Sequence, residues 1–314
     1  MQRSLEALPL TNSMLSEFEL INKYFDWGAG IGDDCALIDV GIHQQFVTTV
    51  DTLIEGVHFP VDTSPVDIAY KALAVNLSDL AAMGATPNYF TLALTLPNID
   101  EQWLEDFSSS LKALATEYNI KLIGGDTTKG MLSITINATG TIQGVALMRS
   151  GAKVGDGIFV SNTLGDAALA WQQIQNQKIP SRNLLTQFNH PEPQVKLGQV
   201  LLGVASSCID ISDGLEQDLS HILSHSKVGA SIDLDALPLS NEVAQYIANT
   251  GDWCVALAGG DDYELCFTVP ESQLDTIQSI EKKLGVVLTK IGVIVESGLE
   301  IKGLDKTCQS YQHF

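Results

Sequence analysis

The 314-residue sequence is poor in basic residues, with 17 lysines and arginines against 38 aspartates and glutamates. The net charge of −21 argues against nucleic acid or an anionic membrane as a partner, because both require a basic surface. No run of about 18 uninterrupted apolar residues is present, so we expect no membrane-spanning helix. Arginine occurs only at Arg3, Arg149 and Arg182, which leaves few candidates for a bidentate phosphate contact.

The five cysteines are scattered through the chain and form no Cys-x-x-Cys pair. The N-terminal segment 1–10 lacks the basic region and the apolar stretch of a signal peptide. Reduced thiols in a cytoplasmic protein are therefore the simplest interpretation.

Three familiar nucleotide-binding motifs are absent. The sequence contains no Gly-x-x-x-x-Gly-Lys-Ser/Thr motif, and it has neither the His-Arg-Asp nor the Asp-Phe-Gly motif of protein kinases. The glycine-rich segment 28–32 leads into two aspartates instead of a helix, which argues against a Rossmann dinucleotide site. A nucleotide would have to be bound in another way.

Periodic apolar patterns predict an α/β chain of the α+β type, with helices and strands mixed in both halves. Ser64 is expected to cap a helix that ends near Met83, because proline and an acidic residue follow it. The other main predicted elements are a helix at 13–25, strands at 46–50 and 89–96, a helix at 100–118, helices at 166–175, 194–204 and 215–224, and strands at 263–269 and 286–295. The turn-rich stretch 149–157 predicts a boundary between two domains, residues 1–150 and 151–314.

Four apolar runs are each followed by a small-residue turn that ends in aspartate, at 30–34, 123–126, 209–214 and 258–262. A single Gly-Asp turn is most often only a turn. Several carboxylates at the ends of buried strands repel one another, however, and they are tolerated when a cation neutralises them. Oxygen ligands without a Cys/His cluster indicate Mg²⁺ rather than zinc, and Mg²⁺ usually binds together with nucleotide phosphates.

Isolated polar residues in apolar surroundings allow two interpretations. Asn76 and Asp79 share one face of an apolar helix, where they either hydrogen-bond to a loop or bind metal. His58 stands alone beside a strand end and is more often structural than functional. His221 and His225 have the spacing of a metal pair, but without a third ligand a solvated helix face is the better interpretation.

Taken together, these motifs resemble the thiamine-monophosphate kinase family of the aminoimidazole-ribonucleotide synthetase-like superfamily. The resemblance covers nearly the whole chain and is most specific at 30–36, 50–59, 70–85, 122–128, 209–215, 259–265 and 311–314. It implies an N-terminal domain that binds ATP and Mg²⁺ and pairs through a β-barrel at a homodimer interface, followed by an α/β domain. It also implies phosphorylation of thiamine monophosphate by ATP without a catalytic nucleophile or general base.

The same resemblance implies roles for individual residues. The implied ligands of several Mg²⁺ ions are Asp34, Thr49, Asp51, Asp79, Asp126, Asp210 and Asp213. The implied ATP contacts are Gly125, Asp126, Arg149 and Ser212. The implied contacts with thiamine monophosphate are His58, Asp261 and Tyr311. Two positions depart from the family pattern, since Val50 replaces a threonine and Asp261 replaces a glutamate.

Two rival interpretations remain. One is another ATP-dependent member of the superfamily, such as a selenophosphate synthetase, although the segment before Gly28 lacks the cysteine that such an enzyme needs. The other is a non-catalytic module that binds a nucleotide or a metal. Such a module would keep some of the acidic residues but not the full set in both halves of the chain.

Overall fold

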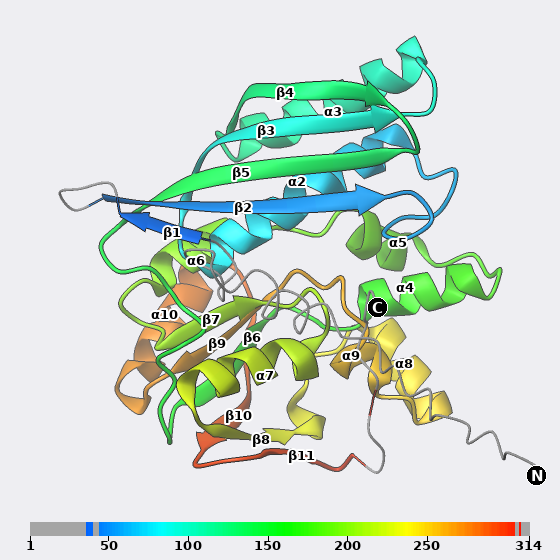
Figure 1. The fold of residues 1–314 in the computed structure, drawn as a ribbon. Coiled ribbons are helices and arrows are strands. Elements are labelled where there is room, and N and C mark those ends of the chain that lie inside the picture. The colour runs from blue at the N-terminus through cyan, green and yellow to red at the C-terminus, as the bar shows by residue number, and fades with distance from the viewer. Residues whose placement is uncertain (1–35, 40–43, 305–307, 309–314) are drawn as a thin grey trace, which may run out of the picture.

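The computed structural model describes residues 36–39, 44–304 and 308, which form two mixed sheets with helices packed against them (Figure 1). The first sheet has the strand order β1 (Ala36–Asp39), β2 (Gln44–Ile54), β5 (Ser133–Gln143), β3 (Thr86–Leu96) and β4 (Lys121–Lys129). Its strands pair antiparallel except for β3 and β4. This sheet is open, so the residues described here form no closed barrel within one chain.

The second sheet is built from the C-terminal half of the chain. Its strand order is β11 (Leu299–Lys302), β8 (Gly229–Asp233), β10 (Leu288–Val295), β6 (Gly157–Ser161), β9 (Leu265–Val269) and β7 (Ser207–Asp210). The helices of this half are α4 (Asp166–Gln175), α5 (Arg182–Asn189), α6 (Val195–Leu201), α7 (Leu215–Ser226), α8 (Asn241–Thr250), α9 (Cys254–Leu257) and α10 (Leu274–Leu284). The mixed α/β fold expected from the sequence is therefore confirmed, while the division into domains at residue 150 stays a prediction.

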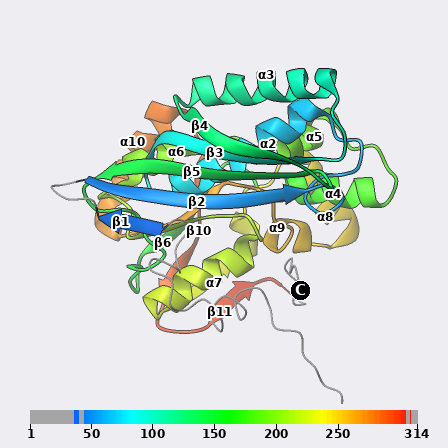
Figure 2. The same cartoon turned by 45° about the horizontal axis from the view of Figure 1, so that its top comes forward.

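Two helices, α2 (Pro65–Ala82) and α3 (Glu101–Glu117), lie on one side of the first sheet (Figure 2). The predicted start of α2 is confirmed, because the Ser64 hydroxyl accepts a hydrogen bond from the Asp67 amide at 3.1 Å and Pro65 follows the cap. The helix ends before Gly84, whose φ of +74° is costly for other residues.

Helix α2 is buried along almost its whole length because it lies between the two halves of the molecule. One side packs on β2 and β5, and the other contacts α6 and β7. The largest hydrophobic core accordingly contains residues from both halves, such as Leu73 and Ile134 together with Leu197 and Phe267. Helix α6 approaches closely, since a Cβ atom on Gly198 would lie 1.9 Å from the Ala81 carbonyl oxygen.

Several elements differ from the sequence-based expectations. Helix α5 and strand β11 were not expected, because each is short and buries too few side chains to show a clear period. Strand β4 extends to Lys129 through two glycines that were assigned to a turn. The predicted helix at 13–25 lies outside the described residues.

Two cysteines also differ from the expectation of reduced thiols. Cys254 and Cys308 form a disulfide with a Cα–Cα distance of 5.3 Å, whereas Cys208 and Cys266 are buried thiols. The pair is separated by 54 residues in the sequence, so only the folded chain brings the two sulfurs together. None of the helices in the described ranges is long and apolar enough to cross a membrane.

The close contact between α6 and α2 generates a first prediction. Gly198→Ala is expected to lower the free energy of unfolding by about 1–3 kcal/mol, because the added methyl group must push α6 away from the Ala81 carbonyl. Urea denaturation monitored by fluorescence measures this change. Lys196→Ala, an exposed change on the same helix, serves as the control and should stay within about 0.5 kcal/mol of the wild type. Equal stability of both variants would contradict the close packing.

Candidate active site

A cavity of about 640 Å³, which we call the central cavity, lies where the end of β2 meets two turns of the C-terminal half. Its lining from the first half is Val50, Asp51, Thr52, Leu53, Ile54, Val57, His58 and Val75. Its lining from the second half is Trp171, Phe188, Ser212, Asp213, Gly259, Gly260, Asp261 and Tyr263. Five of the residues expected from the sequence to contact metal, ATP or substrate therefore border one space: Asp51, His58, Ser212, Asp213 and Asp261.

A second cavity of about 660 Å³ lies between α3 and strands β3 and β4. Its lining is mostly apolar, with Phe90, Leu94 and Phe107 among its residues. None of the residues predicted to bind metal, ATP or substrate borders it. Of these two cavities, the central cavity is therefore the one that residues predicted to bind metal, ATP or substrate border.

Two carboxyl groups meet where β2 passes α2. The Thr49 hydroxyl donates a hydrogen bond to Asp79, and the side chains of Asp79 and Asp51 are hydrogen-bonded to each other. Burial raises the pKa of the Asp51 carboxyl group to about 6, although the hydrogen bond with Asp79 acts in the opposite direction. Two ionised carboxylates about 4 Å apart would repel by about 4 kcal/mol at an effective dielectric constant near 20. The pair therefore needs a shared proton or a cation.

The end of β7 meets the preceding residue of α2, Ser78. The Ser78 hydroxyl donates to an Asp210 carboxylate oxygen at 2.7 Å, so Ser78 and Asp79 connect the carboxylates of the two halves. Asp213 follows in the turn and accepts a hydrogen bond from the Gln217 amide at 2.8 Å. Consecutive residues of one buried helix thus place Asp51 and Asp210 on neighbouring sides of the site.

The turn that contains Ser212 and Asp213 is shaped by Asp218, a residue that the sequence analysis missed. One Asp218 carboxylate oxygen accepts hydrogen bonds from the amides of Ser212, Asp213 and Gly214 at 3.0 to 3.1 Å. These amides precede α7, where the helix leaves N–H groups without partners. An acidic residue in the first turn of a predicted helix is the signal that could have identified this role.

The turn at 258–263 brings a third carboxylate to the cavity. Asp261 accepts hydrogen bonds from the Lys71 ammonium group and from the Tyr263 hydroxyl, both at 3.0 Å. Burial raises the pKa of Tyr263 well above its usual value, and the charges of Asp261, Asp51 and Asp210 raise it further. The charges of three carboxylates thus act on one phenol. Lys71 and Tyr263 were not identified from the sequence.

His58 lies at the cavity in the short turn that follows β2. Its Nδ1 accepts a hydrogen bond from the Ile54 amide at 3.0 Å, which fixes the orientation of the ring. Val50, one of the two departures from the family pattern, also borders the cavity, and its side chain is 59% exposed.

Gly125 and Asp126 are not brought to the central cavity by this chain. Asp51 is paired with Ile136, Ile136 with Leu92, and Leu92 with Gly125, so three strand spacings separate the two sites. At about 4.8 Å per strand, this distance is about 14 Å. Both residues lie on β4, all of whose residues are exposed. Their assignment as ATP and metal contacts stays a prediction.

Arg149 lies beside α7 and does not line the central cavity. Burial lowers the pKa of His221 to about 4, and the charges of Arg149 and His225 act in the same direction. Asp34 and Tyr311 lie outside the described residues. Within the described part of the chain, no three Asp, Glu, His or Cys side chains are close enough together to hold a metal ion.

The donor atoms at the site are nevertheless suited to Mg²⁺. Thr49, Asp51, Asp79 and Asp210 supply only oxygen atoms, which are the ligands that Mg²⁺ prefers. The side-chain oxygen of Asn76, one turn before Asp79 on α2, is buried without a hydrogen-bond partner. These oxygen donors, together with the unsatisfied buried oxygen of Asn76, fit a site that a divalent cation completes.

Family models match both halves of the chain. Residues 32–145 match the N-terminal domain, and residues 153–303 the C-terminal domain, of AIR synthase related proteins. The chain is 48% identical over 295 residues to a thiamine-monophosphate kinase of Haemophilus influenzae, with 90% of each chain covered.

Solved structures of similar proteins give the same result. The crystal structure of thiamine-monophosphate kinase from Stenotrophomonas maltophilia has a TM-score of 0.81 and 44% identity, covering 89% of this chain and 92% of that chain. The structure of AaThiL complexed with AMPPCP and TMP has a TM-score of 0.87 and 29% identity, covering 98% of this chain and 100% of that chain.

The perturbed carboxyl group of Asp51 generates a second prediction. Asp51→Asn is expected to raise the free energy of unfolding of the metal-free protein at pH 7.5 by up to about 3 kcal/mol. The pKa of Asp51 rises from 3.8 to about 6 on folding, so its ionised form opposes folding above pH 6. The gain should therefore be full above pH 6 and should shrink as the pH falls toward 4.

Urea denaturation in the presence of a chelator at pH 7.5 and pH 4.5 measures this difference. Asp62→Asn, a change at an exposed position, is the matched control and should have no comparable effect. A lower stability of Asp51→Asn at pH 7.5 would show that the carboxylate stabilises the metal-free fold instead.

Proposed function

The chain belongs to the thiamine-monophosphate kinase family, and from this premise we propose that it transfers the γ-phosphoryl group of ATP to thiamine monophosphate. The products are thiamine diphosphate and ADP. The observation that carries the proposal is the convergence of Asp51, Asp213 and Asp261 on one cavity, with Asp79 and Asp210 held behind it by α2. A relative whose structure contains AMPPCP, a non-hydrolysable ATP analogue, together with TMP supports the same pair of ligands.

We propose direct in-line transfer, because the acceptor is already an anionic phosphate oxygen and needs no general base. The obstacle is the repulsion between two anionic phosphate groups. Several Mg²⁺ ions, bound by Asp34, Thr49, Asp51, Asp79, Asp126, Asp210 and Asp213, would supply the charge that offsets this repulsion. Gly125, Asp126, Arg149 and Ser212 are the proposed contacts with ATP.

The thiamine moiety is proposed to bind beside the turn at 258–263, with His58, Asp261 and Tyr311 as its contacts. The central cavity also offers an aromatic wall, since Trp171 and Phe188 are stacked with their ring centroids 5.8 Å apart. Flat rings with an apolar face suit such a wall.

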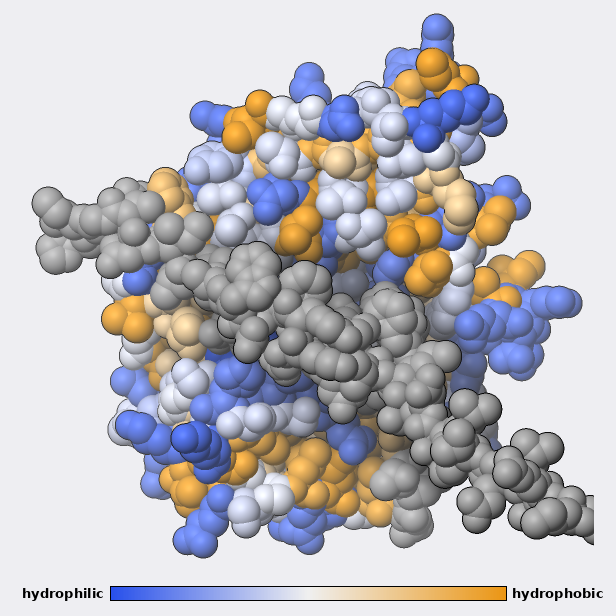
Figure 3. Space-filling model, viewed as in Figure 1, coloured by the Kyte–Doolittle hydropathy of each residue, from blue (hydrophilic) through white to orange (hydrophobic). Residues whose placement is uncertain are grey.

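We also propose that the enzyme is a cytoplasmic homodimer of two-domain chains with a boundary near residue 150, the N-terminal domains pairing through their sheets into a β-barrel. Strand β4 is an edge strand that exposes Leu122 and Ile123, the latter to 61%. The visible face of the first sheet mixes hydrophobic and hydrophilic side chains (Figure 3). An exposed apolar edge strand supports pairing with a second copy, which would also cover Gly125 and Asp126.

A direct assay tests the proposed reaction. The protein incubated with ATP, Mg²⁺ and thiamine monophosphate should form thiamine diphosphate, measured by chromatography. Asp51→Asn should lower kcat by on the order of a thousand-fold, because a carboxylate that offsets phosphate charge through the metal is lost. Asp62→Asn should keep the wild-type rate.

A near-normal rate of Asp51→Asn at saturating Mg²⁺ would contradict the metal role. No thiamine diphosphate from the wild type would favour one of the rivals, another ATP-dependent member of the superfamily or a non-catalytic binding module.

Sedimentation velocity tests the proposed dimer. Ile123→Glu should convert dimer to monomer, because a charge on β4 opposes edge-to-edge pairing. Ile99→Glu is the matched control, since Ile99 is 85% exposed and lies outside the first sheet, and it should stay dimeric. A wild type that sediments as a monomer at all concentrations would rule out the dimer.

A further inference from the structure

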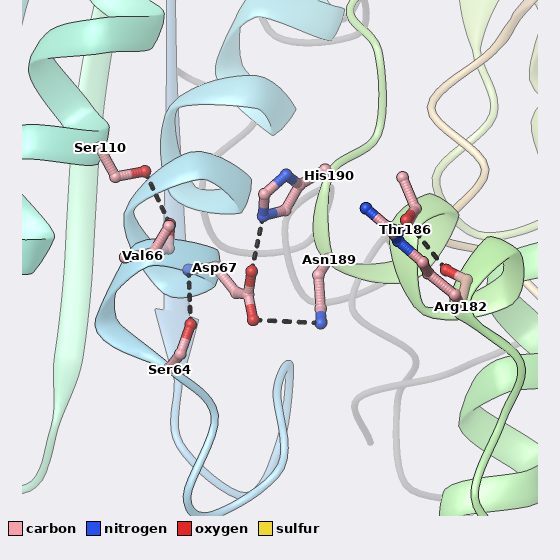
Figure 4. Close-up of polar contacts among 8 residues, drawn as sticks. All are labelled: Ser64, Val66, Asp67, Ser110, Arg182, Thr186, Asn189 and His190. Carbon is pink, nitrogen blue, oxygen red and sulfur yellow. Dashed lines mark hydrogen bonds and ion pairs between the residues drawn. The ribbon is translucent and has the colours of Figure 1, made fainter.

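Helix α2 makes two charged contacts with the C-terminal half, one turn apart. Asp67 reaches the end of α5, where its carboxylate lies 2.6 Å from His190 Nε2 and 3.4 Å from Asn189 Nδ2 (Figure 4). Lys71, four residues later, reaches Asp261. The residues of the first contact do not line the central cavity, whereas Asp261 does.

The ammonium group of Lys71 has a closely defined environment. Its side chain is only 3% exposed, its Nζ lies 3.0 Å from Asp261 Oδ2, and it stands 3.9 Å above the centre of the Phe188 ring. A buried ammonium requires a partner of opposite charge, and the aromatic face adds a cation–π contact. Lys71 therefore has no freedom to reach into the cavity, and its charge acts on Asp261.

The Asp261 carboxylate is held at both oxygens. Oδ2 contacts Lys71 and Oδ1 accepts from the Tyr263 hydroxyl. The backbone at Asp261 has a φ of +63°, and its amide donates to the Ser212 carbonyl at 2.8 Å. A left-handed conformation is uncommon for aspartate, so the turn depends on the contacts that surround it.

The electrostatics of the cavity give this carboxylate a function. Among the described residues that line the cavity, Asp51, Asp213 and Asp261 are acidic and none is lysine or arginine. Thiamine monophosphate carries a permanent positive charge on its thiazolium ring, and a fixed carboxylate attracts that charge. The aspartate side chain is short, so the position of its carboxylate depends on the groups that hold it.

We propose that Lys71 is a positioning residue that holds the Asp261 carboxylate against the thiamine end of the substrate and thereby sets the affinity for thiamine monophosphate. The proposal rests on the proposed kinase function. Because Asp261 acts on the thiamine end and not on the transferred phosphoryl group, its contribution is equal in the ground state and the transition state. Loss of Lys71 should therefore raise KM for thiamine monophosphate and leave kcat nearly unchanged.

Steady-state kinetics of four variants test this role. Lys71→Met, which keeps the length without the charge, should raise KM for thiamine monophosphate about 10- to 100-fold while kcat and KM for ATP change less than about 3-fold. Lys71→Arg should recover most of the affinity. Adding Lys71→Met to Asp261→Asn should change KM less than about 2-fold, because the residue it positions is already lost.

Asp67→Asn is the matched control on the same helix. It weakens the contact with His190 and should lower the melting temperature while KM for thiamine monophosphate stays at the wild-type value. A role for Lys71 in stability alone predicts the same pattern for Lys71→Met. If Lys71→Met fails to fold, the double variant, which buries no unpaired charge, is compared with Asp261→Asn. An equal KM for thiamine monophosphate then supports the role of Lys71, and a further rise contradicts it.

Three results would overturn the role of Lys71: an unchanged KM for thiamine monophosphate in Lys71→Met, an equal rise of both KM values, or additive effects in the double variant. Any of these in a protein whose wild type forms thiamine diphosphate leaves the proposed function intact. A wild type that forms none overturns both.

Discussion

The structure depends on one constraint, the burial of helix α2 between a sheet and the C-terminal half. A helix covered on both sides must be apolar almost all round, and α2 is. Each polar side chain that it does carry then needs a specific partner. Asp67, Lys71, Ser78 and Asp79 find four different partners, in α5, the 258–263 turn, β7 and β2 respectively.

These contacts make the site a product of the packing between the two halves. Asp51 belongs to the first sheet and Asp210 to the second, and neighbouring residues of α2 bind both. Gly198 lets α6 approach α2 closely enough to maintain this arrangement. Any change that separates the halves therefore moves the carboxylates apart, which couples the stability of the core to the geometry of the cavity.

The carboxyl groups that the proposed function needs also lower the stability of the metal-free protein. Carboxyl groups buried without a cation carry a desolvation cost, which the raised pKa of Asp51 expresses. In the proposed reaction, a divalent cation and a polyphosphate would offset that cost when they bind. At Asp261 the charge of the carboxylate is offset by the ammonium group of Lys71, a side chain that does not line the cavity.

Much of this protein follows from local sequence. Ser64, Pro65 and Gly84 determine where α2 begins and ends, because capping and positive φ are properties of a few adjacent residues. The Gly-Asp turns singled out Asp213 and Asp261, which both line the central cavity, since small residues followed by acids after apolar runs carry that signal. The role of Asp51, which lies in no such turn, was implied by the family resemblance.

Tertiary structure decided what depends on distant partners. In the sequence, Lys71 is a single lysine in an apolar helix, and only the fold shows that Asp261, 190 residues later, is its partner. The Cys254–Cys308 disulfide likewise joins two residues that are distant in the sequence. The strand order of the first sheet, invisible in the local pattern, places Asp126 three strands from Asp51. Sequence alone determined which elements form and which residue types carry the chemistry, because these follow from local propensity and periodicity. Only the fold decided which charges meet, because burial and pairing across long separations set the energy of each one.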